Sequence, residues 1–189
     1  MRITRFLSLV DLTVICVVGV AIFVTLVPRP LYAIDAIKVD GDERWGLAVA
    51  EARALTRPDD GVAAAELSRR LREAKVLDWA VEVATQAAAA PESPSRWQAM
   101  LAAAVAYSDR VEVEEALAWA SRAVETCTKA RATCPSEDEV RMQLYASYLA
   151  AGLRSGIDPK KDPEGFRHAA QRTLRPIQLL EPRDHGNKP

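Results

Sequence analysis

The stretch that decides the fold runs from residue 61 to residue 130 and reads GVAAAELSRRLREAKVLDWAVEVATQAAAAPESPSRWQAMLAAAVAYSDRVEVEEALAWASRAVETCTKA. Alanine, the strongest helix former, dominates this stretch, and glycine is scarce in it. Ala64, Leu67 and Leu71 recur with the spacing of one face of an α-helix. Runs of β-branched residues are nearly absent after Val39, so the sequence predicts an all-α protein.

Capping and helix-breaking residues divide the chain into helices. Asp60 is an expected N-cap, because its carboxylate accepts a hydrogen bond from the first turn of the following helix. Ser93 is expected to cap another helix, with Pro94 in its first position. Ser136 and Glu139 have the spacing of a capping box. The expected helices span residues 43–56, 62–75, 78–90, 94–109, 112–130, 136–156 and 162–174. The residues of helix 78–90 expected to face inward are Trp79, Ala80, Val83, Ala84 and Ala87.

An apolar segment precedes this helical region. It is interrupted by Ser8, Asp11 and two threonines, and its length reaches the roughly 20 residues that span a bilayer. Prolines at positions 28 and 30 then stop the helix. The predicted organisation is a cytoplasmic N-terminus at 1–5, a transmembrane helix at 6–27, a linker at 28–41, a helical domain at 42–174 and a C-terminal tail at 175–189.

The charges beside the apolar segment predict its orientation. Arg2, Arg5 and the terminal amine favour an N-terminus in the cytoplasm, which places the helical domain in the periplasm or another extracytoplasmic space. Two alternatives remain open from the sequence. The segment is also compatible with a signal peptide cleaved after Ala33, and with a buried core helix.

An internal repeat is the most informative feature of the helical region. One copy contains Leu67, Ser68, Leu71, Ala80, Ala84 and Ala87, and the other contains Ala103, Ala104, Tyr107, Ala116, Ala120 and Ala123. The copies are 36 residues apart and their internal spacings match: one, three, nine, four and three residues. A period of this length is typical of stacked helical hairpins, in which small residues lie where the helices cross.

This pattern resembles the tetratricopeptide repeat (TPR), a helix–turn–helix unit of about 34 residues. The resemblance covers residues 61–130 and implies a TPR-like α-solenoid that binds other proteins. The sequence departs from the family at several positions: Ala64 and Met100 replace Trp, Leu71 replaces the aromatic residue, Ala103 replaces Leu, and Ala84 and Ala120 replace Phe. A generic array of α-hairpins is the alternative interpretation.

Two of the three cysteines predict a disulfide. Cys127 and Cys134 are seven positions apart, across the step between two expected helices. In an extracytoplasmic domain a disulfide between them is the natural interpretation, and two free thiols are the alternative. Cys16 lies in the apolar segment and is expected to face lipid. No second cysteine pair or histidine stands at the spacing of a metal site, so we expect no metal.

The other polar residues indicate no catalytic site or cofactor. His168 and His185 are far apart, and no ordered set of nucleophile, base and acid is visible. Acidic clusters at residues 112–115 and 137–139 stand at helix starts, where they complement the helix dipole. With a net charge of −1 and no strongly basic block, the chain is not expected to bind nucleic acid.

These observations predict a membrane-anchored adaptor or scaffold of a bacterial-type cell envelope, whose partners are other proteins and the lipid bilayer. A fixed structural subunit of a larger membrane complex is the alternative, and an enzyme with scattered site residues is a third hypothesis. Asp11 either pairs with another transmembrane helix or lies hydrated near the interface. The candidate partner contacts are Asp11, Trp97, Tyr107, Trp119, Tyr145 and Tyr148. For most of the aromatic side chains, a place in the core is the favoured alternative.

Overall fold

The structure, a computed structural model, describes residues 16–19, 41–90 and 93–178. The chain divides into two compact units, residues 1–38 and residues 39–189. In the first unit, residues 16–19 form one helical turn. The described part of the second unit consists of helices and turns, without any strand, so the predicted all-α class is confirmed.

No helix in the described ranges has the length and apolar character needed to cross a membrane. The expected transmembrane helix at 6–27 lies outside the described residues except at 16–19. The N-terminal residues 1–5 also lie outside them, as does the predicted linker before residue 41. The structure therefore lends the anchor no support, and the anchor stays a prediction.

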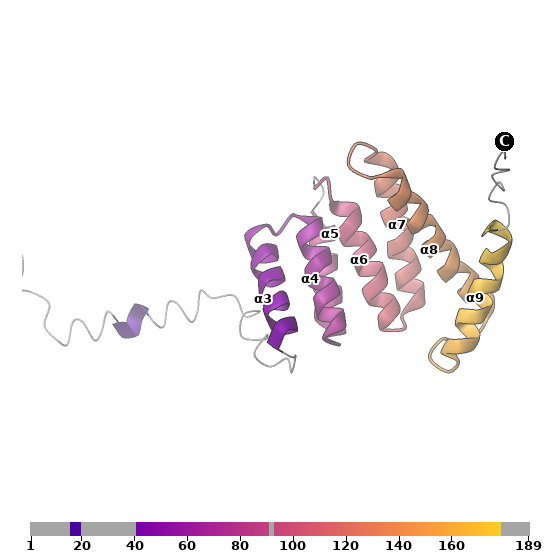
Figure 1. Ribbon diagram of the computed structural model, residues 1–189, viewed down its shortest axis with the longest axis horizontal. Helices are drawn as coiled ribbons and strands as arrows, with labels where there is room; N and C mark the ends of the chain where they lie inside the picture. The colour runs from indigo at the N-terminus through magenta and orange to yellow at the C-terminus, as the bar shows by residue number, and fades with distance from the viewer. Residues whose placement is uncertain (1–15, 20–40, 91–92, 179–189) are drawn as a thin grey trace, which may run out of the picture. The chain divides into compact units, whose positions relative to one another are not determined.

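The helices of the second unit follow one another in a row (Figure 1). They are α3 (Gly41–Thr56), α4 (Gly61–Glu73), α5 (Leu77–Ala88), α6 (Arg96–Asp109), α7 (Val113–Lys129), α8 (Ser136–Arg154) and α9 (Pro163–Gln178). Each helix packs against the next one along the chain, and α4 also packs against α6. The hairpins α4–α5 and α6–α7 therefore stack directly on each other.

These two hairpins turn in the same way. Lys75 and Val111 stand in the turns, 36 residues apart, and both have a φ of 62°. The N–H of the residue after Lys75 donates to the carbonyl of Leu71 at 2.8 Å, and the N–H after Val111 donates to the carbonyl of Tyr107 at 2.9 Å. Each bond closes a Schellman helix end, so the sequence repeat is also present in the backbone.

Small residues lie where the helices of each hairpin cross. Ser68 of α4 is 0% exposed, and its hydroxyl donates to the carbonyl of Ala80 on α5 at 2.9 Å. At the corresponding positions of the next hairpin, Ala104 of α6 and Ala116 of α7 are also 0% exposed. A larger side chain at these positions would force the helices apart.

The hairpin α8–α9 uses a different contact. A Cβ added at Gly152 of α8 would collide with the ring of Phe166 on α9, and that ring is 6% exposed. The Phe166 ring therefore fills the space that a side chain at residue 152 would need. Gly156, with a φ of 71°, follows the end of α8, where the sequence predicted a helix-stopping glycine.

Asp60 caps α4 as predicted: its Oδ1 accepts the N–H of Val62 at 2.9 Å. The predicted cap at Ser93 is wrong. Helix α6 begins at Arg96, two residues after the expected start at Pro94, and Ser93 bonds to the hydroxyl of Ser95 instead. The reason is tertiary, because Ser95 is held by the start of α4, as described below.

The predicted capping box at the start of α8 is also wrong. Pro135 precedes the helix, and no side-chain hydrogen bond caps it. The carboxylate of Glu139 instead accepts the hydroxyl of Thr128 on α7 at 2.9 Å. This contact links the two helices on either side of the turn, which a local capping bond would not do.

Two further differences concern burial and length. Trp79, expected to face inward, is 37% exposed, whereas Val81 on the same helix is only 6% exposed. Helix α9 continues to Gln178, beyond the predicted end at Leu174, so the expected tail 175–189 begins with helical residues.

Candidate functional site

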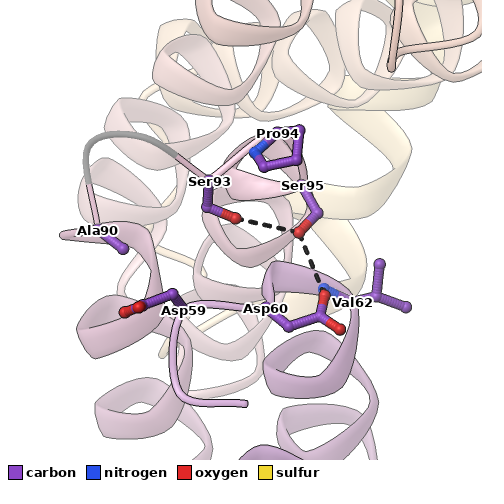
Figure 2. Close-up of a pocket in the computed structure, with 7 residues that line it drawn as sticks. All are labelled: Asp59, Asp60, Val62, Ala90, Ser93, Pro94 and Ser95. Atoms are coloured by element: carbon purple, nitrogen blue, oxygen red, sulfur yellow. Dashed lines mark hydrogen bonds between the residues drawn. The ribbon is translucent and has the colours of Figure 1, made fainter.

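The described chain has a pocket at the edge where the loops α3–α4 and α5–α6 meet (Figure 2). Its volume is about 870 Å³, and it is lined by Asp59, Asp60, Val62, Ala90, Ser93, Pro94 and Ser95. Asp59 and Asp60 come from the first loop, and Val62 stands in the first turn of α4. Ala90 follows α5, and the remaining residues precede α6. The stacking of two hairpins thus creates the pocket.

Hydrogen bonds between the loops hold the pocket together. The N–H of Gly61 donates to Ser95 Oγ at 2.8 Å. Ser95 Oγ donates in turn to Asp60 Oδ1 at 3.2 Å (Figure 2). A Cβ at Gly61 would collide with the backbone carbonyl of Ser95, so glycine is required for this approach. The bonds tie the start of α4 to the start of α6 and fix one wall of the pocket.

Asp59 differs from Asp60 in its surroundings. Asp60 already receives two hydrogen bonds, whereas Asp59 is exposed and forms no ion pair with any other residue of the described ranges. Val62 contributes an apolar side chain that is 53% exposed. The pocket therefore combines an available carboxylate with apolar surface, and its described lining contains no basic side chain.

A third loop joins this edge. The hydroxyl of Thr133, in the turn between α7 and α8, donates to the carbonyl of Pro94 at 3.0 Å. The disulfide between Cys127 and Cys134 closes the same turn, with 5.4 Å between the two Cα atoms. Cys127 is 1% exposed and Cys134 is 7% exposed. The predicted disulfide is thus present, and it braces the loop that contacts the pocket.

The predicted aromatic contacts divide into two groups. Trp97 is 3% exposed and belongs to the core around the disulfide, so it is not available to a partner in this conformation. Tyr107, Trp119, Tyr145 and Tyr148 are partly buried and pack around a second core cluster formed by α6, α7, α8 and α9. The Trp119 ring also lies 4.9 Å from the guanidinium of Arg122.

Tyr145 reaches a polar junction at the end of α6. Burial raises the pKa of Tyr145; Asp109 adds to this effect, and Ser108 and Arg72 oppose it. The hydroxyl is buried and makes no hydrogen bond of good geometry to the described residues, although Ser108 is close enough to affect its pKa. Arg72 Nε lies 2.7 Å from Asp109 Oδ2 and so joins α4 to α6.

The other predicted residues do not assemble into a reactive site. Asp11 and His185 lie outside the described residues, and His168 is exposed on α9. Cys16 is exposed on the helical turn 16–19. Within the described ranges, no three side chains of the metal-binding types are grouped as a metal site requires. The acidic residues at 114–115 and 137–139 occupy the first turns of α7 and α8.

Sequence reasoning missed two features. The first is the pocket, which forms only when loops about 30 residues apart meet. The second is Glu51 of α3, which is 4% exposed and has a carboxylate oxygen without a hydrogen-bond partner in the described chain. Burial raises the pKa of Glu51. The sequence did contain a signal for this burial: Glu51 follows Leu47 by one helical turn, and that spacing places both side chains on the same face of the helix.

Comparisons of the chain with protein families, curated proteins and solved structures found no match.

Proposed function

We propose that this protein is a membrane-anchored interaction module, an adaptor or scaffold that binds other proteins in a bacterial-type cell envelope. The observation that supports it most is the 36-residue recurrence, which appears in the buried small residues and in the turns at Lys75 and Val111. Repeated hairpins build an extended surface suited to binding a peptide or another protein. A TPR-like α-solenoid is the architecture we propose for this domain.

The disulfide supports the proposed compartment. Such bonds persist in oxidising spaces such as the periplasm and are rare in the cytosol. The bond between Cys127 and Cys134 is therefore consistent with a helical domain outside the cytoplasm. In this proposal, residues 6–27 span the bilayer and residues 1–5 stay in the cytoplasm.

Exposed apolar side chains favour a second candidate function, a fixed structural subunit of a larger membrane complex. Val140 and Leu144 stand one turn apart on α8 and are 53% and 41% exposed, and Trp45 on α3 is 73% exposed. Neighbouring exposed apolar side chains, such as Val140 and Leu144, are typical of a surface that another subunit covers, whereas a single one such as Trp45 is common on any protein surface.

The first experiment is a native pull-down of the full-length protein from membranes, with mass analysis of the bait and of each co-purifying chain. The proposal expects a bait that retains residues 1–33 and a defined set of partners. Partners at constant stoichiometry would favour the fixed subunit, and partners at variable stoichiometry would favour the adaptor. A bait that begins near Ile34 without any partner would contradict both functions.

A further inference from the structure

The pocket between the α3–α4 and α5–α6 loops is negatively charged, and this charge indicates the kind of ligand that it binds. Its described lining contains two carboxylates and no lysine, arginine or histidine. Asp60 is occupied by the N–H of Val62 and the hydroxyl of Ser95, so its charge is partly compensated. Asp59 is exposed and lacks such partners among the described residues, which leaves one carboxylate free to bind a cation.

The rest of the lining is suited to an aliphatic chain. Val62 is 53% exposed, and Ala90 and Pro94 contribute further apolar surface. In Figure 2, Asp59 and Ala90 lie on one side of the pocket, Asp60 and Val62 lie on the other, and Pro94 lies above them. Lysine and arginine side chains combine an apolar stem with a charged end, and they cover apolar surface while the charge stays in water.

We propose that this pocket binds a lysine or arginine side chain of a partner protein, with its charged end at Asp59 and its stem against Val62 and Pro94. This inference rests on the proposed binding function and names the chemistry of the partner. The pocket, with a volume of about 870 Å³, has room for a lysine or arginine side chain. An acidic partner segment would be repelled by both carboxylates.

The rigid wall of the pocket favours binding without rearrangement. Gly61 and Ser95 connect the two loops, and Thr133 connects the α7–α8 turn to Pro94. The disulfide closes that turn. The residues that these bonds hold in place lose little conformational entropy when a ligand enters.

The test uses the full-length protein in a zwitterionic detergent and amide NMR spectra. The probes are three blocked tripeptides with alanine on both sides of a lysine, an arginine or a glutamine. We expect the lysine and arginine peptides to shift the resonances of Gly61, Val62 and Ser95 in a saturable way. Replacing Asp59 by Asn should weaken this binding about fivefold, as the loss of one partly screened ion pair would. Added salt should also weaken it.

The control variant is Glu114→Gln, which removes the same charge from exposed surface on α7 and should leave binding unchanged. Denaturation of the Asp59→Asn variant should match that of the wild type, because Asp59 does not cap α4. Equal binding of the glutamine peptide, unchanged binding in Asp59→Asn, shifts confined to other residues, or no shift with any peptide would each overturn the proposal.

The pull-down separates this inference from the proposed function. If Asp59→Asn retains all partners and the peptides do not bind, the pocket proposal fails while the interaction module stands. If the cationic peptides bind as expected but no partner co-purifies, the pocket proposal holds and the proposed function fails.

Discussion

At the scale of single residues, several residues of the domain stand in environments or backbone conformations that lower its free energy of unfolding. Glu51 carries a carboxyl group that is 4% exposed, with one oxygen that has no partner in the described chain. Lys75 and Val111 have a φ of 62°, a conformation that L-residues with a Cβ adopt at a cost. Such positions identify substitutions that should stabilise the protein.

Glu51→Gln should stabilise the domain at neutral pH by about 1 kcal/mol, because it removes a charge that burial disfavours. Burial raises the folded-state pKa of Glu51 above its unfolded value. The stabilising contribution of the protonated group is therefore complete below the unfolded pKa and is lost as pH rises through the folded pKa. The advantage of the variant should grow over the same pH range.

Urea denaturation of both proteins, from acidic to neutral pH, measures this difference. The control is Glu43→Gln, which changes an exposed carboxylate on the same helix and should show a much smaller effect. An advantage that is constant with pH would contradict the assignment of the effect to the buried charge.

Lys75→Gly should raise the free energy of unfolding by about 0.5 to 1 kcal/mol, because glycine adopts a positive φ without steric cost. The side chain of Lys75 is exposed, so little packing is lost. Lys75→Ala is the matched control: it removes the same side chain but keeps the Cβ. Thermal unfolding should therefore show a gain for the glycine variant alone, and an equal gain for both would refute the explanation.

At the scale of elements, the contacts between helices depend on which residue is small. The hairpin α4–α5 crosses at Ser68, and the hairpin α6–α7 crosses at Ala104, both 0% exposed. In the hairpin α8–α9, the ring of Phe166 lies over Gly152. The first two contacts follow the repeat, whereas the third does not, so α8–α9 is joined by its own complementary pair.

Gly152→Ala should destabilise the protein by about 1 to 3 kcal/mol, because the new methyl group displaces the Phe166 ring. Phe166→Ala should cost about 3 to 5 kcal/mol through the cavity that it leaves. In the Phe166→Ala background, Gly152→Ala should become neutral or should stabilise by up to about 1 kcal/mol, since alanine is the better helix former.

A double-mutant cycle with chemical denaturation measures the coupling between these two residues. Additive effects of the two substitutions would mean that the alanine methyl group meets something other than the Phe166 ring.

At the scale of the whole molecule, one edge of the helical domain is connected from loop to loop. Gly61 bonds to Ser95, Thr133 bonds to Pro94, and the disulfide between Cys127 and Cys134 closes the turn that carries Thr133. Stacked helical hairpins are normally held together by contacts between the helices of neighbouring hairpins. The loop edge adds a second connection between the stacked hairpins, beside the pocket.

Replacing Cys127 and Cys134 together by Ser should lower the free energy of unfolding by about 2 kcal/mol, the stabilisation expected from closing a short loop in the unfolded chain. Reduction of the wild type should have a similar effect. Cys16→Ser is the control, because Cys16 is not part of the disulfide. The measurement is chemical denaturation with and without reductant. If the disulfide of the wild type is reduced and its free energy of unfolding does not change, the disulfide does not stabilise the protein.

The sequence by itself determined the all-α class, the N-cap at Asp60 and the 36-residue repeat that is also found in the turns at Lys75 and Val111. It also favoured the pairing of Cys127 with Cys134 over two free thiols. These features depend on interactions within one helix or one short turn, or on a periodicity that is visible in the chain. Local spacing therefore sufficed to predict them.

The tertiary structure alone decided the rest. Ser95 binds Gly61 from another loop, Glu139 binds Thr128 from the preceding helix, and Trp79 stays exposed while Glu51 is buried. The pocket likewise depends on the meeting of two loops. In each case the residue has more than one acceptable partner or environment, and the choice depends on which elements become neighbours when the hairpins stack, which local spacing does not specify.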